Sequence, residues 1–204
     1  SVRTPAPDVI QAALTLYQES LRRPSLTAFC LDFSGSMQGE GETQLKRAMH
    51  FLLTPSEASK ALVQWTPKDK IHVFIFTNVV EGDAEGTGAP DSQSSLLDFV
   101  DRQNAGGGTD MYACLKNAMQ WIEQQPDRGA YLPSILVMTD GKSDGDESGF
   151  EQAWRGGDAV PIFSATFGDA DTSQLDSLAK LSRARVFDGH KDLQGAFRAA
   201  RGYN

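Results

Sequence analysis

The chain has 204 residues, of which 40% are hydrophobic and 23% charged, a profile typical of one globular domain and not of a disordered chain. Its formal net charge of −8, without any Lys/Arg-rich stripe, argues against nucleic acid as a partner. No apolar run approaches the roughly 20 residues that cross a bilayer, which argues against direct membrane insertion.

The N-terminal segment predicts a helix over residues 4–21, because apolar side chains recur there at helical spacing and Thr4 and Pro5 suit a helix start. We expect residues 1–24 to form a helical extension that packs on a main domain of residues 25–204. The chain begins at Ser1 without an initiator Met or an apolar leader. We therefore expect a monomeric domain of a longer or processed chain.

From residue 26 onward, short apolar runs alternate with longer amphipathic stretches, which is typical of parallel strands joined by crossover helices. Strands are expected at residues 26–32, 71–77, 134–139, 160–166 and 185–187, and helices at 42–53, 56–64, 92–101, 110–124, 147–155, 172–181 and 191–201. The last helix has an apolar face and should dock on the sheet. Gly and Asp in residues 78–88 predict a tight reversal with a short edge strand at 79–81. The fold class is α/β, with a mostly parallel central sheet, one short antiparallel edge strand and helices on both faces.

The two cysteines are interpreted as small buried hydrophobes, Cys30 in a strand and Cys114 on the inner face of a helix. Two such positions rarely satisfy the narrow geometry of a disulfide, so a bond between them is the less favoured alternative. Cysteine usage therefore does not indicate a redox compartment.

Three polar segments each lie next to a buried element: residues 32–36 (Asp-Phe-Ser-Gly-Ser), 106–110 (Gly-Gly-Gly-Thr-Asp) and 139–141 (Thr-Asp-Gly). Because the carboxyl ends of strands converge on one crevice in an open α/β sheet, these segments are expected to line one pocket. Their candidate metal ligands are Asp32, Ser34, Ser36, Thr109 and Asp140. Two carboxylates and three hydroxyls suit Mg²⁺ or Mn²⁺ and disfavour zinc.

This arrangement resembles the metal-ion-dependent adhesion site (MIDAS) of von Willebrand factor type A (vWA) domains, over about residues 26–200. The resemblance implies a Rossmann-like vWA fold in which Ser34, Ser36 and Thr109 offer hydroxyls to the ion. Asp32 and Asp140 would act largely through water. It also implies Mg²⁺ or Mn²⁺, with Ca²⁺ as a further candidate, and a partner protein that presents Asp or Glu to the open coordination position. In such a module ligand binding would shift the helix at 191–201.

Alternatives to this adhesion module fit the residues less well. A phosphoaspartate phosphatase needs a second Asp where Ser34 stands. A Gly-x-Ser-x-Gly elbow over residues 35–39 would need Ser where Met37 stands, and no Walker lysine follows a Gly-rich loop, so we expect no enzyme activity. A vWA assembly subunit that works with an ATPase partner in the cytoplasm stays open. Residues 22–32 resemble bacterial surface vWA segments, which favours an extracytoplasmic setting, with tethering to a membrane through flanking regions.

Two neighbouring features are candidates for further contacts with a metal or a ligand. Residues 144–149 match half of a calcium-binding EF-hand loop, but Arg155 occupies the position that requires a bidentate Glu, so a solvated acidic loop is expected. Met37, Trp65, Trp121 and Trp154 are all expected to be packing residues. Among these four, Met37 is the best placed to touch a ligand, because it follows the second serine of the motif.

Overall fold

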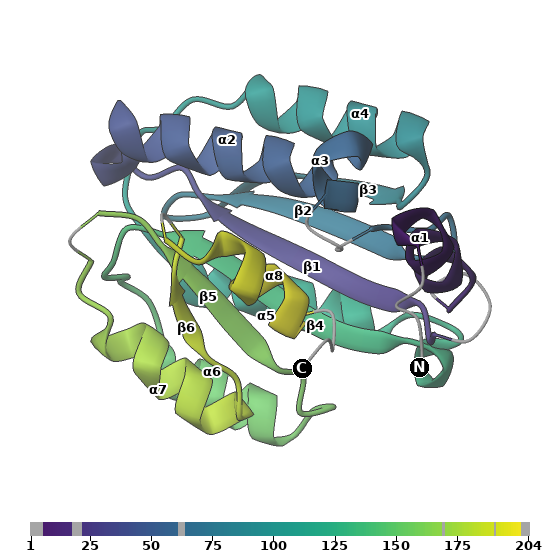
Figure 1. Ribbon diagram of the computed structural model, residues 1–204. Coiled ribbons are helices and arrows are strands. Elements are labelled where there is room, and N and C mark those ends of the chain that lie inside the picture. Colours follow the sequence, from purple (N-terminus) through teal and green to yellow (C-terminus); the bar gives the residue numbers. More distant parts are fainter. Residues whose placement is uncertain (1–5, 18–21, 61–63, 169, 190, 201–204) are drawn as a thin grey trace.

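A six-stranded sheet forms the centre of the molecule in a computed structural model that describes residues 6–17, 22–60, 64–168, 170–189 and 191–200 (Figure 1). The strands are β1 (Ser25–Asp32), β2 (Lys70–Phe76), β3 (Val80–Thr87), β4 (Leu132–Thr139), β5 (Ile162–Thr166) and β6 (Val186–Asp188). They lie in the order β3-β2-β1-β4-β5-β6. Only the pair of β2 and β3 is antiparallel, which confirms the predicted α/β fold.

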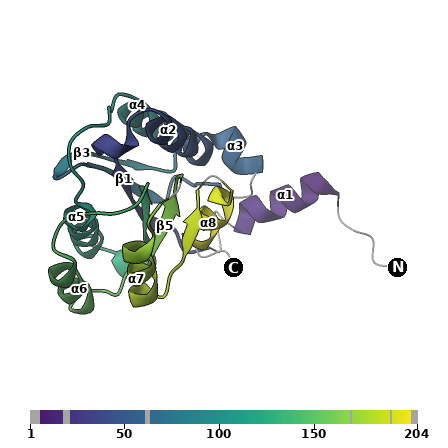
Figure 2. The same ribbon diagram turned by 90° about the vertical axis from the view of Figure 1, so that its left-hand side faces the viewer.

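Helices cover both faces of the sheet (Figures 1 and 2). One layer contains α2 (Glu40–Leu53), α3 (Pro55–Lys60), α4 (Pro90–Asp101) and α8 (Leu193–Ala200), and the other contains α5 (Met111–Glu123), α6 (Glu147–Arg155) and α7 (Ser173–Ser182). Each layer encloses its own apolar cluster. In β1, Phe29 and Leu31 enter the first cluster, whereas Ala28 and Cys30 enter the second. The strand is apolar on both faces because both faces are buried.

The C-terminal helix α8 docks on the sheet through Ala196, Phe197 and Ala200, all of which are buried. The ring of Phe197 lies 5.0 Å from the ring of Trp65, measured between centroids. This packing confirms the docking that the apolar face of the segment predicted.

Strand β3 is longer than expected, since it runs over eight residues and pairs with the whole of β2. Its Gly and Asp residues had indicated a turn. In the strand the small residues Gly82, Ala84 and Gly86 alternate with exposed acidic residues, and a side chain at Gly86 would collide with Ser92 and Leu96 of α4. The glycines therefore allow a helix to approach the strand closely instead of marking a reversal.

The N-terminal helix α1 (Pro7–Leu16) projects from the body of the molecule (Figure 2). Val9, Ile10, Leu16 and Tyr17 are 43–61% exposed, so the expected packing of this helix on the domain is wrong for these side chains. The outer parts of the predicted helix, residues 4–5 and 18–21, lie outside the described residues, and the boundary at residue 24 stays a prediction.

The helix expected at 56–64 is shorter, since α3 ends at Lys60 and residues 61–63 lie outside the described part. The other predicted elements agree with the observed ones within two residues, except for β3 and α1. None of the helices in the described part has the length and apolarity to span a membrane.

Candidate metal centre

Two loops are joined backbone to backbone at the carboxyl end of β1. The amide of Gly35 donates to the carbonyl oxygen of Gly107 (2.9 Å), and the amide of Gly106 donates to the carbonyl oxygen of Phe33 (2.8 Å). A Cβ atom at Gly35 would lie 3.2 Å from the Gly107 oxygen, so glycine makes this close approach possible. The loop of residues 106–110 therefore lies against the loop of residues 33–36.

Asp32 is the buried anchor of the site, with no exposed surface. One carboxylate oxygen, Oδ1, accepts from the amide of Ser34 (2.8 Å), and Oδ2 accepts from the hydroxyl of Thr139 (2.7 Å). Loss of hydration on burial raises the pKa of Asp32, and the nearby charge of Asp140 raises it further, against the lowering effect of the hydrogen bonds from Ser34 and Thr139. No described cationic side chain pairs with this carboxylate.

The hydroxyls of the motif continue from Asp32 to Asp140. The Oγ atoms of Ser34 and Ser36 are 3.2 Å apart, and Ser36 donates to Oδ1 of Asp140 at 3.1 Å. Hydrogen bonds therefore bring together four of the five predicted ligands, which come from two different loops.

Thr109, the fifth predicted ligand, lies in the glycine-rich loop. Its carbonyl oxygen accepts from the amide of Asp144 (2.8 Å), and the next residue, Asp110, caps α5 by accepting from the amide of Ala113. No direct hydrogen bond joins its hydroxyl to the other four ligands, all of which are described. The structure thus positions the loop of Thr109 against the motif without a direct contact from its side chain.

The donor set fits a hard divalent cation. Within the described residues no three His, Cys, Asp or Glu side chains lie close enough to hold a metal together, so a site here would combine two carboxylates with hydroxyls. Such oxygen donors are those that Mg²⁺, Mn²⁺ and Ca²⁺ prefer. The buried carboxylate of Asp32 lies near a second carboxylate and has no described cationic partner, and a divalent cation would neutralise both charges.

Sequence reasoning missed the residues that hold these loops in place. Thr139 orients Asp32 through a hydrogen bond from its hydroxyl. This role was not predicted, although the position of Thr139 at the end of an apolar strand, next to Asp140, could have indicated it. The hydroxyl of Ser143 accepts from the amide of Met111 (2.8 Å) at the start of α5. Gln174 of α7 accepts from the amide of Ser143 (2.8 Å) and donates to its carbonyl oxygen (2.9 Å). No local sequence signal indicates Gln174, because its partner lies 31 positions away.

Two expectations for the neighbourhood have different outcomes. Met37 is fully buried in the first apolar cluster, which confirms that it is a packing residue and excludes a contact with a ligand: the 3₁₀ turn Gly35–Met37 directs its side chain into the core, against Gly41. In the acidic segment, Asp146 is the N-cap of α6 and accepts from the amide of Gly149 (2.9 Å). This carboxylate therefore has a structural role at a helix start.

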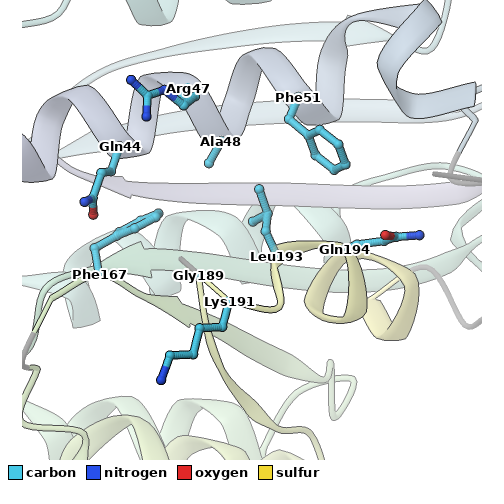
Figure 3. A pocket seen from close by; sticks show the side chains of 9 residues that line it. All are labelled: Gln44, Arg47, Ala48, Phe51, Phe167, Gly189, Lys191, Leu193 and Gln194. Atoms are coloured by element: carbon cyan, nitrogen blue, oxygen red, sulfur yellow. The ribbon is translucent and has the colours of Figure 1, made fainter. Parts of the chain in front are cut away.

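A depression adjoins the motif at Ser36 and Asp140 and has a volume of about 300 Å³. Its other lining residues are Gln38, Glu40, Gly41, Gln44, Phe167 and Gly168. A groove of about 390 Å³ between α2 and α8 is also lined by Gln44 and Phe167 (Figure 3). The two hollows therefore meet along α2, and together they extend from the motif toward the C-terminal helix.

Comparisons with known proteins agree with this architecture. Residues 27–142 match the family model of the von Willebrand factor type A domain. Among similar solved structures are a von Willebrand factor type A protein from Catenulispora acidiphila (TM-score 0.65, 18% identity, 86% of this chain and 41% of that one) and an aerotolerance-related membrane protein from Bacteroides fragilis (0.64, 14%, 88% and 98%). A third is proximal thread matrix protein 1 from the mussel byssus with a zinc-occupied MIDAS motif (0.62, 17%, 87% and 46%).

These likenesses show the fold alone, because the identities are low. The chain spans less than half the length of the Catenulispora protein. No curated protein sequence matches the chain.

Proposed function

Because the chain belongs to the von Willebrand factor type A domain family, whose members are generally protein-interaction modules, we propose that it binds a partner protein through a divalent cation. The proposed ligands of the cation are Asp32, Ser34, Ser36, Thr109 and Asp140. The observation that carries the proposal is the Asp32 carboxylate, which is fully buried without a described cationic partner and hydrogen-bonded within a row of hydroxyls that ends at Asp140.

We propose Mg²⁺ or Mn²⁺ as the cation, with Ca²⁺ as a further candidate. When bound, the cation would supply a positive centre that attracts a carboxylate of the partner, since two protein carboxylates only balance its charge. The backbone contacts of Gly35 and Gly106 and the Gln174–Ser143 pair hold the loops in place for it. The mussel protein carries zinc in its MIDAS motif, so zinc belongs among the ions to be tested.

The surface next to the motif supports a partner that offers an acidic side chain. The depression beside Ser36 and Asp140 is open and large enough for one side chain, and its wall continues over Gln44 and Phe167. The nearby carboxylates of Glu40 and Asp140 would repel an acidic group unless a cation lay between them. We therefore propose that partner binding depends strictly on the metal, and that the domain acts by binding alone, without catalysis.

We propose an extracytoplasmic setting, as part of a longer protein. The resemblance of residues 22–32 to bacterial surface vWA segments supports the extracytoplasmic setting.

The test has two stages and does not require a known partner. Titration calorimetry would first measure binding of Mg²⁺, Mn²⁺, Ca²⁺ and Zn²⁺ to the wild-type chain, to Ser34→Ala and to Ser177→Ala. Ser177 is an exposed residue of α7 whose hydroxyl donates only to the backbone of its own helix, which makes its variant a matched control. A displayed library of random peptides would then be selected on the wild-type chain in Mg²⁺ and eluted with EDTA.

We expect Mg²⁺ or Mn²⁺ to bind the wild-type chain and the control but not Ser34→Ala. Selected peptides should share an Asp or Glu, and changing that residue to Asn or Gln should abolish binding. Equal metal affinity in Ser34→Ala would place the ion elsewhere. Peptides that bind equally well in EDTA, or without an acidic residue, would contradict the proposed recognition.

A further inference from the structure

The two cysteines of the chain meet in the core, close in sequence to the candidate metal ligands. Their Sγ atoms are 2.6 Å apart, which is close to the covalent sulfur–sulfur distance of about 2.05 Å. We infer that Cys30 and Cys114 form a disulfide when the protein folds in the presence of an oxidant, and that this bond ties β1 to α5.

The packing of α5 on β1 explains why the two side chains converge. Cys30 points to the face of the sheet that α5 covers, because the residues on either side of it in the strand point to the opposite face. Cys114 lies on the inner face of α5 beside Met111, Leu115 and Ala118. Both thiols are fully buried among apolar side chains. A disulfide suits this environment, since it leaves no polar hydrogen without a good acceptor.

The reaction proceeds by exchange with a small disulfide such as oxidised glutathione. The thiolate of one cysteine attacks the oxidant, forms a mixed disulfide and releases one small thiol. The thiolate of the other cysteine then attacks the protein sulfur of the mixed disulfide, so the Cys30–Cys114 bond forms and the second small thiol leaves. The two protein thiols lose two electrons and two protons, and the oxidant gains them as two thiols.

The reaction belongs to folding because the native core is closed to an oxidant. Neither sulfur is exposed, and burial raises the pKa of the Cys114 thiol, so the folded reduced protein reacts slowly. The same burial protects the bond from reducing agents once it has formed. A reductant should reach it only after the chain unfolds.

The bond would affect both stability and the loops of the metal centre. It joins residues 84 positions apart, and closing a loop of this length restricts the unfolded chain strongly. For a domain of this size we expect the unfolding midpoint to rise by on the order of 10 °C. Cys30 lies two residues before Asp32, and Cys114 five residues after Thr109, so the bond anchors the strand and the helix from which two of the three loops extend.

The experiment uses the full chain without metal, so that it is independent of the proposed function. The protein is unfolded in denaturant with dithiothreitol, then refolded in parallel with oxidised glutathione or with dithiothreitol. Each sample is unfolded again in the presence of N-ethylmaleimide, and peptide mass spectrometry identifies free and linked cysteines. Thermal unfolding compares the two samples, and Cys30→Ala/Cys114→Ala, carried through both refolding conditions, controls for effects of the redox buffer.

We expect the oxidised wild-type protein to take up no maleimide, to be two hydrogen atoms lighter than the reduced protein and to contain the 30–114 linked peptide. It should melt higher than the reduced protein of the same sequence, whereas the double variant should melt identically in both buffers. The native oxidised protein should also resist dithiothreitol until denaturant is added. Full alkylation of both cysteines after oxidative refolding, or a linked protein that melts no higher than the reduced one, would overturn the inference.

Discussion

Replacement of Asp32 by Asn should change the stability of the protein in opposite directions with and without metal. In the metal-free protein burial raises the pKa of Asp32, so the ionised carboxylate destabilises the folded state. This destabilisation is absent at a pH well below the ordinary pKa of 3.8. It grows as the pH rises through the raised pKa and is present in full above it. Asn carries no charge, so Asp32→Asn should be at least as stable as the wild type in EDTA at neutral pH.

The shape of the site supports this expectation, because Asn can keep both hydrogen bonds of Asp32. Its oxygen can accept from the amide of Ser34, and its amide group can donate to the hydroxyl of Thr139, at heavy-atom distances that are now 2.8 and 2.7 Å. The loss of hydrogen bonding should therefore be below about 1 kcal/mol. Asn is, however, a neutral ligand and should bind a divalent cation much more weakly.

Thermal unfolding in EDTA and in Mg²⁺ measures both effects. A metal at 100 times its dissociation constant stabilises the wild type by about 2.7 kcal/mol, which corresponds to a rise in midpoint of about 5 to 10 °C for a domain of this size. We expect this rise to vanish in Asp32→Asn. The reasoning is refuted if the variant keeps the full rise, or if it melts well below the wild type in EDTA.

Asp69→Asn is the matched control, since Asp69 is also a buried aspartate and lies at the opposite end of β1. It accepts from the amide and hydroxyl of Ser25 and from the amide of Thr66. An amide group cannot accept at both carboxylate positions, so this variant should lose about 1–3 kcal/mol in either buffer. Its response to metal should equal that of the wild type.

Three further outcomes are expected. Phe197→Ala removes a fully buried ring that packs on Trp65, so it should lower the free energy of unfolding, measured by chemical denaturation, by about 3–5 kcal/mol. An unchanged free energy of unfolding would show that α8 does not dock as described. Gln174→Ala removes two hydrogen bonds to the loop after β4 and should cost about 1–3 kcal/mol by the same measurement, with a weaker affinity for metal in calorimetry. The pKa of Asp171 is lowered to about 2, mainly by the hydrogen bond that its carboxylate accepts from the Ser173 hydroxyl. NMR titration should therefore show a charged carboxylate down to about that pH, and Ser173→Ala should raise the pKa toward 3.8. An unchanged pKa in this variant would contradict the role of Ser173.

The sequence was sufficient to predict the alternation of strands and helices and the meeting of the loops that carry the candidate ligands. Both depend on local properties: buried parallel strands need continuous apolar runs, and the site needs oxygen-bearing side chains and glycine at strand ends. Four of the five candidate ligands are joined by hydrogen bonds although they come from segments more than a hundred positions apart.

Features that depend on contacts between distant elements could not be predicted in this way. The extent of β3 depends on how closely α4 approaches Gly86, and the orientation of Met37 depends on the 3₁₀ turn that follows β1. The proximity of Cys30 and Cys114 requires knowledge of where α5 crosses β1. In each case the residue types were compatible with two arrangements, and the packing of a neighbouring helix or turn selected one.

The two outer strands also have a consequence for self-association. A free strand edge offers unpaired amides and carbonyls to another molecule, and like charges or short length prevent such pairing. On β3 the exposed side chains of Glu81, Asp83 and Glu85 repeat at every second position, whereas β6 has only three residues. Two copies that approach through β3 would bring these rows of negative charge together. Growth of one sheet into another through this edge is therefore disfavoured.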